Sequence, residues 1–153
     1  MMENIMTIAQ KYNLYVVEDA CMGIGAKMNN KCPGTFGKVN AFSMHPLKSL
    51  NVMGDGGMIT TDDDNIAEWI KKYRNHGMID RDNIIFWGVN SRLQPLQAIV
   101  ALHGLKTLDK VISKRNKNAK ILDDHLYKIK YVKIPKRIKN NTETFALYMA
   151  LFK

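Results

Sequence analysis

The spacing of apolar residues changes along the chain, and each kind of spacing predicts a different element. Residues 14–17 (LYVV) form a short apolar run that ends at two acidic residues, which is typical of a buried parallel strand. Residues 39–44 and 57–61 are two further short apolar runs, and they predict two more strands. The last residues, 142–153, form a longer apolar run that predicts a final strand.

Helical spacing separates and follows these strands. Residues 62–77 begin with an aspartate that can cap a helix, place four apolar or aromatic residues on one stripe and stop at a glycine. Residues 3–12 and 93–108 show shorter helical patterns, the second with a proline in its first turn. Over 105–130 the apolar positions recur every three or four residues, which predicts one long amphipathic helix. Helices and strands joined by short links favour an open α/β sheet.

Composition narrows the class of protein. The chain has 153 residues, of which 46% are hydrophobic and 24% charged, the balance of one ordinary globular domain. It contains no apolar run as long as a membrane span, and we expect that its first residues are not a secretory signal, because they lack a basic flank and a continuous apolar core. Two cysteines without C-x-x-C spacing fit a reduced, cytoplasmic setting, and a disulfide between them is the alternative. The histidines show no metal-ligand spacing.

The net charge of +9 lies in one part of the sequence. Residues 1–103 carry ten basic and ten acidic residues, whereas residues 104–140 carry twelve basic and three acidic ones. A basic stripe of this kind is most simply the solvated face of the long helix. A nucleic-acid surface is the minority interpretation, because aromatic residues do not interleave with the charges. We therefore expect neither nucleic acid nor membrane as a partner.

Three reactive or polar groups follow the predicted strands. Asp19 and Ser43 stand at strand ends and Lys48 lies in the next loop, and ligands of open α/β sheets bind at the carboxyl ends of strands. A carboxylate, a hydroxyl and an amine suit pyridoxal 5′-phosphate (PLP), which has a basic ring nitrogen, a phosphate and an aldehyde. Taken singly, Asp19 would be a turn residue and Lys48 a solvated lysine. Ser43 has no His/Asp context, which argues against a hydrolase triad.

Six segments in a fixed order carry a more specific signal. They are EDACM (18–22), GTFG (34–37), SMHPLK (43–48), GDGG (54–57), RNHG (74–77) and GVNSRLQPLQAIVAL (88–102). Together they resemble the DegT/DnrJ/EryC1/StrS family of PLP-dependent sugar aminotransferases, and the likeness covers essentially the whole chain.

The resemblance implies an α/β fold, namely part of the large domain of a PLP-dependent transferase (aspartate aminotransferase-like, fold type I), with a mainly parallel sheet flanked by helices. Residues 1–104 would be the C-terminal half of the PLP-binding domain, 105–130 a long connecting helix and 131–153 the start of a truncated small domain. Family members are longer, so we expect this chain to be a fragment that lacks the stacking aromatic and some phosphate contacts.

The resemblance also implies roles for individual residues. Lys48 would be the Schiff-base lysine and the proton shuttle, and Asp19 would pair with the pyridine nitrogen. Ser43 would bind the cofactor phosphate, and Asn90 would reach the phosphate in the neighbouring subunit of a homodimer.

Two positions near the cofactor depart from the family pattern. Cys21 replaces a small alanine expected under the ring of the cofactor. Met22 stands where the family usually has glutamine or histidine, and a thioether can hardly replace the hydrogen bond that such a side chain makes.

By this resemblance the function is transfer of an amino group from an amino acid, typically glutamate, to a keto-sugar nucleotide, as in polysaccharide or lipopolysaccharide biosynthesis. An inactive or partner-dependent truncated paralogue is the alternative. Less favoured are a PLP-dependent sugar dehydratase, which would carry histidine in place of Lys48, and a basic nucleic-acid binder.

Overall fold

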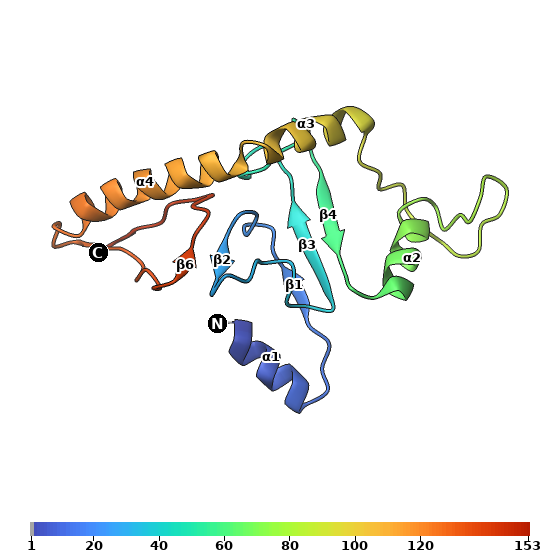
Figure 1. Ribbon diagram of the computed structural model, residues 1–153, viewed down its shortest axis with the longest axis horizontal. Coiled ribbons are helices and arrows are strands. Elements are labelled where there is room, and N and C mark those ends of the chain that lie inside the picture. The colour runs from blue at the N-terminus through green and yellow to red at the C-terminus, as the bar shows by residue number, and fades with distance from the viewer. Residues whose placement is uncertain (1) are drawn as a thin grey trace.

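The structure, a computed structural model, describes residues 2–153 and is built around a three-stranded sheet (Figure 1). Its strands lie in the order β1-β3-β4. Their bounds are β1 Val17–Asp19, β3 Val39–Ser43 and β4 Gly57–Thr60. β1 and β3 run parallel, whereas β4 runs antiparallel to β3. The α/β class is confirmed, and the sheet is mixed where a mainly parallel one was expected.

Residues 2–153 contain four helices. They are α1 Met2–Lys11, α2 Asp64–Tyr73, α3 Pro95–Leu105 and α4 Leu108–Leu126. The Asp63 side chain caps α2 by accepting from the Ile66 amide at 3.1 Å, as its sequence predicted. The predicted helix over 105–130 is confirmed in its centre but starts later, because Lys106 and Thr107 close α3 and open α4.

The first strand begins three residues later than predicted, because the end of α1 uses the preceding residues. Asn13 has φ of 51° and lies in the left-handed conformation that commonly ends a helix. The Leu14 amide then donates to the Ala9 carbonyl at 2.8 Å, and the Asn13 amide donates to Gln10 at 3.3 Å. This pair of bonds is a Schellman motif. Leu14 therefore belongs to the helix end, and of the predicted run 14–17 only Val17 lies in β1, where it pairs with Val39.

Two small sheets lie beside the main one. β2 (Lys27–Met28) pairs with β6 (Asn141–Thr142), and β5 (Val132–Lys133) pairs with β7 (Leu151–Phe152). The predicted strand over 142–153 is therefore wrong for most of its length. After α4 the chain turns back along that helix (Figure 1), and side chains of α4 hold the carbonyl groups of the 143–148 segment. Those carbonyls are not free for a sheet.

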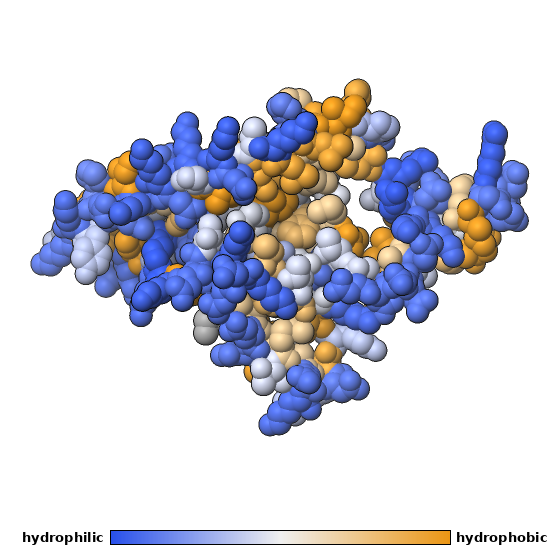
Figure 2. Space-filling view, viewed as in Figure 1, coloured by the Kyte–Doolittle hydropathy of each residue, from blue (hydrophilic) through white to orange (hydrophobic). Residues whose placement is uncertain are grey.

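Apolar and polar surfaces divide between the two C-terminal helices. Hydrophilic residues cover α4 at the left of Figure 2, and apolar residues gather over α3 at its top. The exposed apolar side chains of α3 are Leu96, Ile99, Leu102 and Leu105. An apolar surface of this kind is typical of an association site.

The buried core lies between α3 and the loop after β3. Its buried members are Met44, Leu50, Val52 and Ala101. α3 carries glycine at position 104 where it meets this loop, and a Cβ there would lie 2.8 Å from Leu50 Cδ1. The core therefore fixes the loop that contains Lys48 against α3.

Shortening Leu50 should destabilise the fold. It is 4% exposed, and Leu→Ala changes at buried sites cost about 2–5 kcal/mol because a cavity remains. We expect Leu50→Ala to lower the free energy of unfolding by that amount in urea titrations. Leu96→Ala is the matched control, since Leu96 is 77% exposed. Equal effects of the two changes would contradict the assignment of this core.

Candidate active site

The ends of β1 and β3 bring three predicted residues to one edge of the sheet. Asp19 is the last residue of β1 and lies opposite Ala41 in the parallel register. Ser43 is the last residue of β3 and lies opposite Gly57 of β4. Lys48 follows in a turn in which its amide donates to the His45 carbonyl at 2.9 Å. The topology thus places these residues near one edge of the sheet, and their roles in a site stay a prediction.

A cavity of about 380 Å³ lies at this edge, within the range of about 300–1,000 Å³ typical of small-molecule sites. Its lining residues are Met22, Ser43, His45, Leu47, Lys48, Asp55, Gly56 and Leu147. Three predicted site residues, Met22, Ser43 and Lys48, therefore meet in one cavity. Leu147 comes from the far end of the chain, and no sequence signal pointed to it.

Met22 makes a contact that the sequence did not predict. The Lys48 Nζ atom donates to the Met22 Sδ atom at 2.8 Å. A thioether is a weak acceptor, so this contact orients the amine more than it stabilises it. Met22 thus takes a polar role at the position where a stronger hydrogen-bonding side chain was expected.

Cys21 interacts directly with Asp19. Its backbone amide donates to Asp19 Oδ1 at 3.0 Å. Hydrogen bonds from the side chain and the backbone of Cys21 hold the pKa of the Asp19 carboxyl below its ordinary value, and the charge of Lys48 acts in the same direction. Asp19 is therefore ionised at neutral pH.

The Cys21 thiol is correspondingly kept protonated. Its pKa is raised, first by the Asp19 carboxylate and then by burial. The thiol has one proton to share between that carboxylate and the Ala41 carbonyl, which lies 3.8 Å from Sγ. We assign the proton to the charged acceptor, because charge-assisted hydrogen bonds are the stronger ones.

The Ser43 hydroxyl acts as a hydrogen-bond acceptor in the described structure. Its Oγ accepts from the His45 amide at 3.3 Å, and within residues 2–153 no acceptor for its hydroxyl proton is found. His45 Nδ1 accepts from the Leu47 amide at 3.2 Å, and His45 Nε2 lies 3.9 Å from Asp55 Oδ1. The polar side of the cavity thus combines a hydroxyl, an imidazole and a carboxylate.

Asn90 lies apart from Lys48. It lines a second cavity of about 1,030 Å³ beside β4 and α2, and its Oδ1 accepts from Arg92 Nε at 2.9 Å. The two cavities share Asp55 and Gly56 in their linings. The expected role of Asn90 concerns a neighbouring subunit and stays a prediction.

Two structural searches of the described residues gave negative results. No helix within residues 2–153 combines the length and the hydropathy needed to cross a bilayer. In the same part of the chain, no three His, Cys, Asp or Glu side chains gather in a way that could hold a metal ion.

Comparison with known proteins identifies a family. The profile of the DegT/DnrJ/EryC1/StrS aminotransferase family matches residues 1–153. The chain is 37% identical over 152 residues to the dTDP-3-amino-3,6-dideoxy-alpha-D-galactopyranose transaminase of Aneurinibacillus thermoaerophilus, covering 99% of this chain and 42% of that protein. It spans 27–42% of the length of this and four other curated relatives that it matches.

Solved structures agree with this result. A DegT DnrJ EryC1 StrS aminotransferase from Brucella abortus matches with a TM-score of 0.91 and 32% identity, covering 98% of this chain and 40% of that one. NtdA from Bacillus subtilis, described with bound cofactor PMP, matches with a TM-score of 0.87 and 28% identity, covering 99% of this chain and 35% of that one. The likeness confirms the predicted fold, part of the PLP-dependent transferase architecture.

Proposed function

The chain belongs to the DegT/DnrJ/EryC1/StrS aminotransferase family, and from this we propose that it acts in the transfer of an amino group from an amino acid to a keto-sugar nucleotide. Glutamate is the expected donor and PLP the expected cofactor. The relative named as a dTDP-amino-sugar transaminase supports the substrate class, and the neighbour described with PMP supports the cofactor. The observation that carries the proposal is the Lys48 amine and the Ser43 hydroxyl in one cavity, beside an ionised Asp19.

The Lys48 amine and the Ser43 hydroxyl of the cavity, together with Asp19 at the end of the neighbouring strand β1, fit the chemical groups of PLP. The Lys48 amine can attach an aldehyde, and the unused Ser43 hydroxyl proton can be donated to a phosphate oxygen. The lowered pKa of Asp19 keeps this carboxylate negative, as pairing with a protonated ring nitrogen requires. When bound, PLP supplies an electron sink for the negative charge that develops at the donor carbon.

The chain's own residues would divide the work in the following way. Lys48 would hold the cofactor and carry the proton between donor and acceptor. Asp19 would accept a hydrogen bond from the protonated ring nitrogen, and Ser43 would donate a hydrogen bond to the phosphate. Cys21 would lie under the ring, and Met22 would orient the Lys48 amine through its sulfur.

The assembly and the division into domains are part of the same proposal. Asn90 would contact the phosphate of a second copy in a cytoplasmic homodimer, and the exposed apolar stripe of α3 supports an association surface. Residues 1–104 would serve as the PLP-binding part, with 105–130 as connection and 131–153 as part of a small domain.

The proposed transfer can be measured with the purified chain, PLP, glutamate whose amino nitrogen carries an isotopic label, and keto-sugars linked to UDP, dTDP or GDP. The proposal predicts label in one sugar nucleotide, and none with the Lys48→Ala variant; because the chain spans only 27–42% of the length of its relatives, we expect the yield to be small. Label in none of them, with PLP attached to Lys48, would overturn the substrate class alone. Absence of PLP from Lys48 would overturn the cofactor and the reaction together.

A further inference from the structure

The C-terminal segment 143–148 forms one wall of the Lys48 cavity. Leu147 lines the cavity, and the Thr144 hydroxyl donates to the Met22 carbonyl at 2.7 Å across 122 positions of sequence. Thr144 is 7% exposed, so this bond is shielded from water. The segment therefore holds the loop whose sulfur touches the Lys48 amine.

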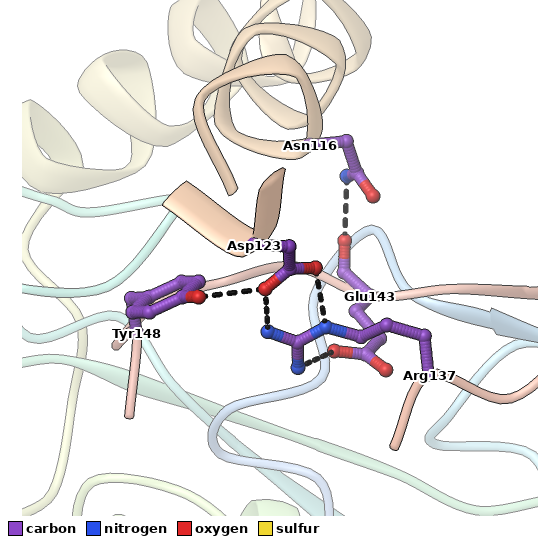
Figure 3. A network of polar contacts seen from close by, with 5 residues as sticks. All are labelled: Asn116, Asp123, Arg137, Glu143 and Tyr148. Atoms are coloured by element: carbon purple, nitrogen blue, oxygen red, sulfur yellow. Dashed lines mark hydrogen bonds and ion pairs between the residues drawn. The ribbon is translucent and has the colours of Figure 1, made fainter. Parts of the chain in front are cut away.

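An ionic network fastens this segment to α4 (Figure 3). The Asp123 carboxylate accepts from Arg137 Nε at 3.0 Å and from a second Arg137 nitrogen at 2.8 Å. It also accepts from the Tyr148 hydroxyl at 2.6 Å. Arg137 reaches Glu143 at 3.4 Å as well. Bidentate hydrogen bonds between an arginine and a carboxylate are strong and directional. Through this pair, Tyr148 at one end of the segment and Glu143 at the other end are held in place.

Aromatic rings and two further side chains complete the anchor. The Arg137 guanidinium lies 4.8 Å from the Phe145 ring centroid and 5.4 Å from that of Tyr148, within cation–π range. Arg115 donates to the Phe145 carbonyl at 2.7 Å. Asn116 donates to the Glu143 carbonyl at 2.7 Å (Figure 3). Both the side chains and the backbone on either side of Thr144 are thus held in place.

The Met22 loop is in turn fixed at two points. The Cys21 amide donates to Asp19, and the Met22 carbonyl accepts from Thr144. One bond joins the loop to the end of β1 and the other joins it to the anchored segment. Loss of the Thr144 bond would leave the Met22 side free to turn away from Lys48.

We propose that Thr144 is a positioning residue for Lys48, and that its hydroxyl holds the Met22 carbonyl so that the Met22 sulfur orients the Lys48 amine in the cavity. The Arg137–Asp123–Tyr148 network supplies the rigid support from which Thr144 acts. The importance of this for amino transfer rests on the proposed function, whereas the positioning itself can be measured without any cofactor.

The test measures the rate at which acetic anhydride acetylates Lys48 in the cofactor-free chain. Peptide mass spectrometry follows the reaction, and the exposed Lys114 serves as the internal reference. In Thr144→Val we expect Lys48 to react faster, by at most about fivefold, because the amine loses its contact with the Met22 sulfur, which contributes no more than one ordinary neutral hydrogen bond. Thr144→Ser keeps the hydroxyl and should stay within about twofold of the original chain. Circular dichroism checks that each variant is folded, and Thr144→Ala replaces Thr144→Val if the latter is not.

A second background separates positioning from a general loosening of the fold. Met22→Leu removes the sulfur, so in this background Thr144→Val should produce no further acceleration at Lys48. The proposal would be overturned if Thr144→Val accelerated the acetylation of Lys48 equally in both backgrounds, or in neither background. Attachment of PLP to Lys48 is then measured in the same variants by borohydride reduction. A Met22-dependent effect of Thr144→Val with no PLP attachment in the original chain would sink the proposed function and leave the positioning role standing.

Discussion

Replacing Lys48 with alanine is expected to abolish covalent attachment of PLP. Lys48 is the lysine that lines the cavity with Ser43, and an aldehyde held there by its phosphate meets this amine first. We expect borohydride reduction and peptide mapping to place the label on Lys48 in the original chain and to find none in the variant. Amino transfer should fall by at least about 10²–10⁴-fold, the contribution of a positioned proton-transfer group.

Two controls define this result. Lys48→Arg keeps a positive charge near Met22 but has no amine that can attach an aldehyde, so it should behave as alanine does. Lys27→Ala removes an exposed lysine of β2 and should leave the label on Lys48 unchanged. Label spread evenly over the basic residues of 104–140, with none on Lys48, would show that the cavity does not select its lysine.

Asp19→Asn is expected to keep PLP attached and to remove most of the transfer activity. The amide preserves the shape of the side chain but no longer carries the negative charge that would keep a ring nitrogen protonated. Loss of one charge-assisted hydrogen bond corresponds to a decrease in rate of about 10- to 100-fold. The measurement compares labelling of Lys48 with the rate of amino transfer, and Asp55→Asn tests a second carboxylate of the edge. Parallel loss of labelling and activity in Asp19→Asn would instead indicate damage to the cavity.

The pH dependence follows from the direction of the shift. The pKa of Asp19 is lowered by Cys21, so the carboxylate is ionised above its ordinary range and for some distance below it. The contribution of ionised Asp19 to the free energy of unfolding is fully present above the pKa that Asp19 has in the unfolded chain. This contribution disappears as pH falls through the lower pKa of Asp19 in the folded chain. A loss of activity between neutral pH and the ordinary aspartate range would therefore have to come from another group.

Local signals predicted those parts of the fold whose causes are local. The helix over 62–77 has its cap, stripe and stop within one segment, and α2 forms there. The start of β1 was wrong because the positive φ of Asn13 draws Leu14 into the end of α1. The final strand was wrong because Arg115 and Asn116 of α4, the preceding helix, donate hydrogen bonds to carbonyl groups of this segment.

The candidate site divides in the same way. Asp19 and Ser43 could be placed at one edge because the parallel strands β1 and β3 both end there, and the cavity brings Lys48 to Ser43 but does not include Asp19 in its lining. The contact of Met22 with Lys48 depends on how a loop turns, and the place of Leu147 depends on a segment that returns from the end of the chain. Neither has a periodic or motif signal, since both arise only when the chain is packed.

The bond between Thr144 and Met22 also sets an order of events during synthesis. It joins residues 122 positions apart, and at about 5–20 residues per second the ribosome makes the second partner roughly 6–24 s after the first. The β1–β3–β4 sheet comes entirely from the first 60 residues, so its strands leave the ribosome long before the segment that closes the cavity. The edge that carries Ser43 and Lys48 is therefore made first as an open shelf, and Leu147 can line the cavity only after α4 and the 143–148 segment have also been synthesised.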